Sequence, residues 1–122
     1  MGLSNIMIVE DSKSTASLMT LLLRLLGHNV THIVASGEEA IKLAKSRNID
    51  LILMDIRLDG QIDGIEAAKV IRGFSAIPIV FVSAYSDSEI IERAMGIGAV
   101  DYIRKPFRTK QFTDTMENFS LA

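Results

Sequence analysis

Short apolar runs alternate five times with segments of helical pattern along this chain. The apolar runs occupy residues 5–10, 29–34, 50–55, 77–83 and 99–103. The helical patterns occupy residues 12–26, 36–46, 64–72, 86–95 and 109–119. Regular alternation of this kind predicts a doubly wound α/β fold, in which right-handed crossovers join parallel strands. We therefore expect one parallel sheet of five strands with helices on both faces.

The composition of the runs predicts the order of the strands. The third and fourth runs are apolar without alternation, as expected of central strands that are covered on both faces. The second run is more polar, with Thr31 and His32 within it, which suits an edge strand. Five strands with the second at one edge fit the order 2-1-3-4-5. In such a sheet ligands bind in the crevice outside the carboxyl ends of the strands.

Polar side chains follow four of the apolar runs, at the predicted ligand-binding edge. They are Glu10 and Asp11 after the first run, Asp55 at the end of the third, Ser83 at the end of the fourth and Lys105 after the fifth. Carboxylates brought this close raise one another's pKa unless a cation intervenes. Mg²⁺ prefers octahedral oxygen coordination and usually takes one or two carboxylates. The set suits a divalent cation and a phosphoryl group attached to one of the carboxylates.

Each of these residues also has a simpler interpretation. Asp11 could only cap the following helix, as could Ser12, and Ser83 could be a turn former. Lysines in loops are usually solvated, but here the preceding strand delivers Lys105 to the pocket edge. A cis Lys105-Pro106 bond would turn the lysine inward, and X-Pro is where a cis bond costs little. Capping does not explain why Asp55 closes an apolar strand, so we favour the site.

The composition excludes several classes of protein. The 122 residues include no cysteine, hence no disulfide framework, thiolate zinc site or cysteine nucleophile. A net charge of -2 offers no general attraction for nucleic acid or an anionic membrane. The start of the chain resembles no signal peptide, and no apolar stretch is long enough to cross a bilayer. We expect a single cytoplasmic domain over residues 1–122 that binds neither nucleic acid nor membrane.

The motifs Glu10-Asp11, Met54-Asp55, Asp63-Gly64, Ser83-Ala84 and Lys105-Pro106, at these intervals, resemble the receiver domain of two-component response regulators. The resemblance covers essentially the whole chain. It implies a flavodoxin-like (βα)5 fold and a phosphorylation switch that resets by slow autodephosphorylation. A receiver catalyses phosphoryl transfer only to itself, so it is not a conventional enzyme.

The resemblance implies a role for each site residue. Asp55 is the expected phosphoacceptor, and Glu10, Asp11, Asp55 and the backbone carbonyl of Arg57 the expected Mg²⁺ ligands. Ser83 and Lys105 would hold the phosphoryl oxygens, and Ser83 and Tyr102 would form the switch, in which the Tyr102 ring turns in from solvent. The expected phosphodonor is a histidine kinase or a histidine phosphotransfer protein. An output domain or downstream protein would bind the face made by the fourth helix, fifth strand and fifth helix.

The segment after Asp55 departs from the commonest receivers. Residues 56–64 are one residue longer and lack the usual proline, which is similar to receivers associated with sensor kinases. Two other functions remain as alternatives. A Mg²⁺-dependent phosphohydrolase using an aspartyl-phosphate would need an acid/base carboxylate where Arg57 stands, and a substrate cap. A degenerate receiver that signals without phosphate would be expected to lack a pocket residue, and none is missing.

Three remaining features have structural interpretations. His28 and His32 have no third metal ligand near them in sequence, so we expect structural roles. In the first helix we expect Leu18, Leu21, Leu22 and Leu25 to form the apolar face. Met19, Leu23 and Leu26 lie off that stripe, and they would then leave apolar surface either exposed to a partner or covered by the loop after the fifth strand. Ser36 with Glu39 and Ser86 with Glu89 predict capping boxes for the second and fourth helices.

Overall fold

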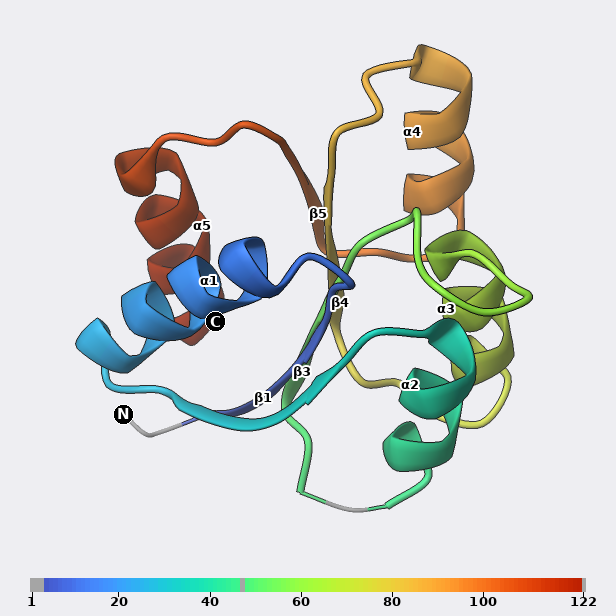
Figure 1. Cartoon of the computed structure of the whole chain (residues 1–122), viewed down its shortest axis with the longest axis horizontal. Helices are drawn as coiled ribbons and strands as arrows, with labels where there is room; N and C mark the ends of the chain where they lie inside the picture. Colours follow the sequence, from blue (N-terminus) through green and yellow to red (C-terminus); the bar gives the residue numbers. More distant parts are fainter. Residues whose placement is uncertain (1–3, 47, 122) are drawn as a thin grey trace.

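The computed structural model describes residues 4–46 and 48–121, which form one twisted parallel sheet with helices on both faces (Figure 1). The strands are β1 (Asn5–Val9), β2 (Asn29–Val34), β3 (Leu51–Met54), β4 (Ile79–Ser83) and β5 (Asp101–Arg104). All four pairings are parallel, and the order is β2-β1-β3-β4-β5. The predicted fold and strand order are confirmed, with β2 at one edge.

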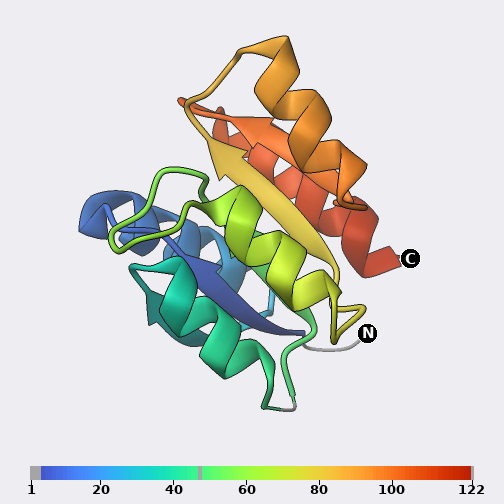
Figure 2. The same ribbon diagram turned by 90° about the vertical axis from the view of Figure 1, so that its right-hand side faces the viewer.

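Two helices cover one face of the sheet and three cover the other. They are α1 (Lys13–Leu25), α2 (Gly37–Ala44), α3 (Gly64–Arg72), α4 (Ser88–Gly96) and α5 (Thr109–Leu121). α1 and α5 lie together on one side, and α2, α3 and α4 lie on the other, where the quarter-turned view shows them in front of the strands (Figures 1 and 2). Among the described residues no helix has the length and apolar character needed to cross a membrane.

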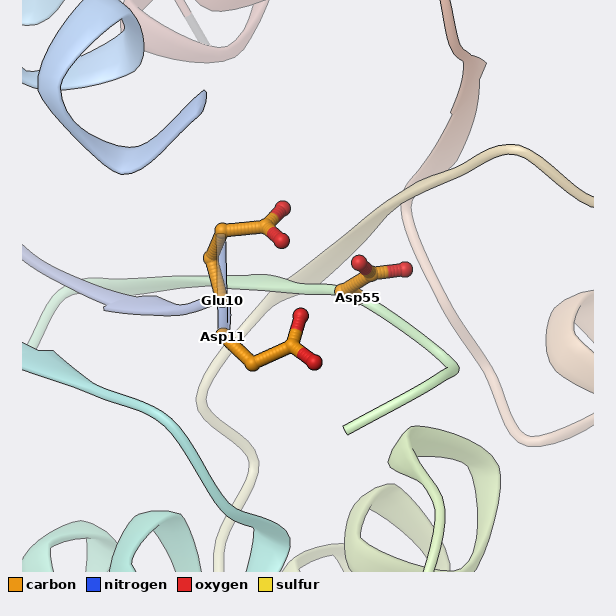
Figure 3. A group of neighbouring side chains, drawn as sticks. All are labelled: Glu10, Asp11 and Asp55. Carbon is orange, nitrogen blue, oxygen red and sulfur yellow. The ribbon is translucent and has the colours of Figure 1, made fainter. Parts of the chain in front are cut away.

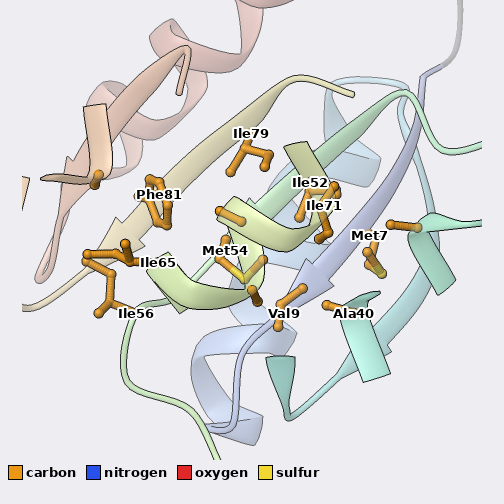
Figure 4. Packing of buried hydrophobic residues seen from close by; sticks show 14 of the residues in the cluster. Met7, Val9, Ala40, Ile52, Met54, Ile56, Ile65, Ile71, Ile79 and Phe81 are labelled. Atoms are coloured by element: carbon orange, nitrogen blue, oxygen red, sulfur yellow. The ribbon is translucent and has the colours of Figure 1, made fainter. Parts of the chain in front are cut away.

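The sheet separates two hydrophobic cores. Successive strand residues point to opposite faces, so Met7 and Val9 enter the core beneath α2 and α3, while Ile6 and Ile8 enter the core beneath α1 and α5. Figure 4 shows the first of these cores, between the strands and α2 and α3. All four residues of β3 are buried, as expected for a central strand covered on both faces.

The face of α1 that packs against the sheet differs from the expected one, although Leu22, which was expected on the apolar face, is buried at 7% exposure. Met19 and Leu23 are buried under the helix, at 1% and 0% exposure, and they were expected to lie off the apolar face. Leu18, Leu21 and Leu25 are exposed at 44%, 56% and 74%. α1 carries leucine on both stripes, so helical periodicity alone does not distinguish them. The face that meets the sheet is determined by the direction in which the chain leaves β1.

The starts of three helices show which capping interpretations hold. Ser36 caps α2 and accepts from the backbone N–H of Glu39 at 3.2 Å, as predicted. The predicted box at Ser86 is wrong: Asp87 caps α4 instead and accepts from the Glu89 N–H at 3.2 Å. Both Ser and Asp are good caps, so adjacent candidates compete. An unpredicted capping box, Asp63 with Glu66, opens α3.

The two histidines show no metal-binding arrangement. His28 is buried, and burial lowers its pKa, which favours the neutral ring. The His32 Nδ1 lies 3.1 Å from the Thr31 hydroxyl at the sheet edge. Within residues 4–46 and 48–121 neither joins a group of three possible metal ligands. Structural roles for both stay a prediction.

Candidate functional site

The strand ends deliver the predicted site residues to one edge of the sheet. Glu10 and Asp11 directly follow β1, Asp55 directly follows β3, and Ser83 is the last residue of β4. Lys105 follows β5. The Asp55 N–H donates to the Val9 carbonyl at 2.9 Å, and the Lys105 N–H donates to the Ser83 carbonyl at 2.8 Å. Hydrogen bonds between neighbouring strands therefore keep these residues side by side at the edge of the sheet.

Three carboxylates form an acidic cluster, which comprises Glu10, Asp11 and Asp55. One oxygen from each lies within 4.8 Å of the others, and Figure 3 shows the three groups gathered around one space. Glu10 and Asp55 are buried and Asp11 is exposed. Hard oxygen donors on a partly open edge fit a magnesium ion that retains several waters. The donor chemistry of the cluster therefore fits the expected cation.

Lys105 bridges the two buried carboxylates. Its Nζ donates to Glu10 Oε1 at 2.7 Å and to Asp55 Oδ2 at 2.8 Å. The Lys105-Pro106 peptide is cis, and the lysine side chain reaches into the site, as the sequence suggested. The remaining carboxylate oxygens accept from backbone: Glu10 Oε2 from the Ser12 N–H at 3.1 Å and Asp55 Oδ1 from the Ile56 N–H at 2.7 Å.

Burial changes the protonation of this group of charges. It raises the pKa of Glu10 to about 7, and the nearby Asp55 charge adds to the rise, although the Lys105 hydrogen bond acts in the opposite direction. Burial alone would lower the pKa of Lys105, but its hydrogen bonds to Asp55 and Glu10 outweigh this, and the pKa is raised. The ammonium is therefore charged, whereas burial, with a smaller contribution from the Asp55 charge, opposes ionisation of Glu10.

A pocket of about 310 Å³ opens beside the cluster. Its lining comprises Asp11, Asp55, Arg57, Ser83, Ala84 and Tyr85. Ser83 is 1% exposed, and its Oγ accepts from the Tyr85 N–H at 3.3 Å. Ala84 adds little bulk beside it. The pocket therefore places a hydroxyl opposite the carboxylates, with space between them for a small group.

Tyr102 lies next to this pocket, half-buried. Its ring centroid is 6.2 Å from that of Phe81, and its hydroxyl donates to the Tyr85 carbonyl at 2.8 Å. Burial raises the pKa of the Tyr102 hydroxyl. The sequence analysis expected this ring to turn in from solvent; here it already packs inward. Sequence reasoning missed Tyr85, because nothing in the sequence shows that its carbonyl faces the Tyr102 hydroxyl.

The backbone after Asp55 approaches closely at Gly64. The Gly64 N–H donates to the Ile56 carbonyl at 2.7 Å, and any Cβ at Gly64 would overlap the Asp55 carbonyl oxygen. The side chain of Ile56 is 3% exposed. These contacts fix both ends of the loop that carries Arg57. The Asp63-Gly64 pair was noted in the sequence, but its steric role depends on a backbone contact that the sequence does not display.

Comparison with known proteins places this arrangement in a family. The model of the response regulator receiver domain matches residues 6–117, and the chain belongs to that family. Receiver domains of this kind act as phosphorylation-activated signalling switches and bind Mg²⁺ at an acidic site. The fold and the strand-end residues described above agree with this membership, and the phosphohydrolase alternative is not favoured.

Two similar curated proteins are a DNA-binding response regulator and a transcriptional regulatory protein, and both are longer than this chain. The DNA-binding response regulator MtrA of Mycobacterium tuberculosis is 35% identical over 106 residues, which are 87% of this chain and 46% of that protein. The transcriptional regulatory protein ZraR of Salmonella typhimurium is 34% identical over 117 residues, 95% of this chain and 26% of that protein. The chain thus spans half or less of the length of these relatives.

One similar solved structure shows a metal ion. The receiver domain of the sensor histidine kinase PA1611 from Pseudomonas aeruginosa is 30% identical, with a TM-score of 0.86. The match covers 99% of this chain and 100% of that one, and that structure holds a magnesium ion coordinated in its active-site cleft. Relatives thus include both transcriptional regulators and a sensor-kinase receiver, so the sensor-kinase-associated pattern seen in residues 56–64 stays a prediction.

Proposed function

We propose that Asp55 accepts a phosphoryl group from the phosphohistidine of a histidine kinase or a histidine phosphotransfer protein. The observation that carries the proposal is the convergence of Glu10, Asp11, Asp55 and Lys105 on one site from the ends of three strands. Asp11 and Asp55 both belong to the acidic cluster and line the pocket, and Asp55 in addition accepts from the Lys105 ammonium at 2.8 Å. Asp55 is therefore the one best placed to meet an incoming phosphoryl group.

The metal proposal uses the acidic cluster and one backbone group. Glu10, Asp11, Asp55 and the carbonyl of Arg57 would hold Mg²⁺, with Glu10 acting less directly than Asp11, because Asp11 lines the pocket and Glu10 is not among the lining residues. The bound ion would neutralise negative charge on the phosphoryl oxygens. The donor chemistry of the cluster and the magnesium ion in the PA1611 receiver support this assignment.

The transfer step conserves atoms and electrons. A carboxylate oxygen of Asp55 attacks the phosphorus atom, so that a phosphorus–oxygen bond forms while the phosphorus–nitrogen bond to the donor histidine breaks. The imidazole nitrogen keeps the electron pair of the broken bond. Water later attacks the acyl phosphate and releases inorganic phosphate, which restores the Asp55 carboxylate. Both half-reactions occur on this chain, without a separate small-molecule substrate.

Lys105 and Ser83 would hold the product. Phosphorylation adds close to ~2 negative charges and strong acceptor oxygens. Lys105 already donates to Asp55 Oδ2, so its ammonium needs only a small shift to reach a phosphoryl oxygen. The Ser83 hydroxyl, which now accepts from the Tyr85 N–H, would donate to another. Each such bond to a charged group contributes about 1.5–3 kcal/mol.

Ser83 and Tyr102 would carry the signal to the face formed by α4, β5 and α5. A shift of Ser83 changes the contacts of the neighbouring Tyr85, whose carbonyl accepts from the Tyr102 hydroxyl. Because the ring already lies inward, we propose that phosphorylation stabilises this position against an outward one. Amide hydrogen exchange with and without beryllofluoride tests this: unchanged exchange over residues 84–105 would contradict it.

The extent of the domain, its location and its partners are part of the same proposal. Residues 1–122 would form one receiver domain in the cytoplasm, phosphorylated there by its histidine kinase. MtrA is a DNA-binding regulator, which supports an output domain or a downstream protein as the partner of the α4–β5–α5 face. No nucleic-acid or membrane contact is assigned to the receiver itself.

A small phosphodonor tests the reaction without knowledge of the cognate kinase. The protein is incubated with acetyl phosphate, with and without Mg²⁺, and its intact mass is measured. We expect a gain of one phosphoryl group that requires Mg²⁺ and disappears with time. No gain under either condition would contradict the proposed function.

A further inference from the structure

A second glutamate, outside the acidic cluster, lies against the loop that carries Arg57. It is Glu38, in the first turn of α2. The part of the loop that it contacts comprises residues 59–61, which we call the loop tip. Glu38 is 23 positions before Gln61 in the sequence, so their contact belongs to the tertiary fold.

The contact between Glu38 and the loop tip is specific. Glu38 Oε2 accepts from the Gln61 N–H at 2.8 Å. Gly60 has a positive φ of 93°, and a Cβ there would overlap Glu38 Oε1. Both carboxylate oxygens of Glu38 are therefore placed against backbone of the loop tip. A charge-assisted hydrogen bond of this type is roughly twice as strong as a neutral one.

The loop tip is also joined to the segment between β2 and α2. The Asp59 N–H donates to the Ala35 carbonyl at 3.1 Å, and Ser36 and Asp59 form an isolated parallel bridge. The neighbouring Glu39 has a different contact: its Oε1 accepts from the Ser36 hydroxyl at 3.1 Å at the cap of α2. Glu39 also accepts from the Ala35 N–H at 3.4 Å, so it holds the segment before α2, whereas Glu38 contacts the loop tip directly.

The loop tip leads directly to Arg57 and the pocket. On one side of Arg57, Ile56 is anchored in the core and accepts from the Gly64 N–H. On the other side, Leu58 is half-buried, and the held loop tip follows. Arg57 itself has an exposed side chain and lines the pocket. Its backbone position is therefore held on one side by an anchor in the core, and on the other by the pairing of Asp59 and the contact of Glu38 with the loop tip.

We propose that Glu38 is a positioning residue for the metal site, because it holds the loop tip and with it the carbonyl of Arg57. This inference rests on the proposed function, in which that carbonyl is a metal ligand. Glu38 would not bind the metal, since the described residues place it outside the cluster of Glu10, Asp11 and Asp55. Its effect on affinity would act wholly through the loop backbone.

Two Glu38 variants and a matched neighbour test the inference. Mg²⁺ affinity is measured by calorimetric titration of wild type, Glu38→Ala, Glu38→Gln and Glu39→Ala. Residues that orient metal ligands alter affinity by about 10–100-fold, and for Glu38→Ala we expect the lower end of this range, about tenfold weaker binding. Glu38→Gln keeps an acceptor oxygen and should retain most of the affinity. Glu39→Ala removes the same charge and weakens the α2 cap, but should bind Mg²⁺ as wild type does.

Amide exchange in the metal-free protein, together with the titrations, shows whether the metal site or only the role of Glu38 is wrong. In the metal-free protein, amide exchange at Gln61 should be faster in Glu38→Ala than in wild type, and nearly unchanged in Glu38→Gln. If wild type binds no Mg²⁺, the metal part of the proposed function is wrong. If wild type binds Mg²⁺ and Glu38→Ala binds equally well, or if Glu39→Ala weakens binding as much, the positioning role of Glu38 is wrong.

Discussion

Lys105 Nζ donates to Asp55 Oδ2 at 2.8 Å, across 50 positions of sequence, and the same ammonium holds Glu10 at 2.7 Å. In the metal-free protein this single positive charge lies between two buried carboxylates. Removing one member of a buried ion pair leaves an uncompensated charge in the protein interior. The lysine therefore contributes to stability before it contributes to phosphoryl transfer.

Lys105→Met should destabilise the metal-free protein, since it keeps most of the side-chain length but removes the ammonium. We expect the free energy of unfolding in EDTA to fall by about 1.5–3 kcal/mol, the range for a hydrogen bond to a charged group. Denaturant unfolding measures this. Lys110→Met is the matched control: Lys110 pairs with Asp114 on the exposed surface, where removing an ion pair costs little. Equal losses in the two variants would contradict the role of Lys105.

Mg²⁺ should stabilise the unmodified protein, because it relieves repulsion within the acidic cluster. A ligand at a hundred times its dissociation constant adds about 2.7 kcal/mol to the free energy of unfolding. Thermal unfolding with and without millimolar Mg²⁺ measures the effect. Asp11→Asn should reduce the shift of the midpoint. A shift of the same size in wild type and Asp11→Asn would remove Asp11 from the ligand set.

The stability of the metal-free protein should fall as pH rises through the titration of Glu10. Burial raises the pKa of Glu10 to about 7, from 4.5 for an unperturbed carboxyl, so between these values the folded state holds a proton that the unfolded state has released. Stability is then greatest at low pH within this window and declines towards pH 7. Denaturant unfolding in EDTA at pH 5 and pH 8 compares wild type with Glu10→Gln.

We expect the decline from pH 5 to pH 8 to be smaller in Glu10→Gln, which does not titrate at that position. The burial of His28 acts with the opposite sign, because it lowers the pKa of the ring, but it contributes to both proteins alike. Parallel pH profiles for the two proteins would show that Glu10 does not titrate as described.

Gly64→Ala should destabilise the fold and disturb Asp55, since the new methyl would overlap the Asp55 carbonyl oxygen. Overpacking against backbone costs about 1–3 kcal/mol. Gly96→Ala is the control, because a Cβ at Gly96 has no neighbour within 4 Å and alanine favours a helix. Unfolding free energies and Mg²⁺ affinity are compared. A Gly64→Ala protein as stable as wild type would mean that α3 can move away from Asp55 at little cost.

The sequence was sufficient for the architecture and for the charged residues at strand ends. β3 and β4 are continuous apolar runs, and their covered position follows from that composition. Glu10, Asp55 and Lys105 could be placed together because parallel strands bring their carboxyl ends to one edge. These inferences depend on patterns repeated over many residues, so errors of one or two residues at strand ends did not affect them.

Features that depend on a choice between equivalent residues could not be predicted. Leu21 and Leu23 both lie on apolar stripes of α1, yet only Leu23 is buried, because docking onto the sheet and not helical periodicity selects the face. Ser86 and Asp87 are both good caps, and composition alone does not indicate that Asp87 is the one that caps α4. The contact of Glu38 with the Gln61 N–H joins a side chain to a distant backbone group, for which the sequence gives no signal.

Phosphorylation of Asp55 tests the central claim most directly. Wild type, Asp55→Asn and Asp59→Asn are incubated with a phosphorylated histidine phosphotransfer protein and Mg²⁺, and their intact masses are measured. Asp59 is exposed and lies in the same loop, so its variant controls for the loss of a nearby carboxylate. We expect one added phosphoryl group on wild type and Asp59→Asn and none on Asp55→Asn. An equal gain on Asp55→Asn would place the modification elsewhere and contradict the proposed function.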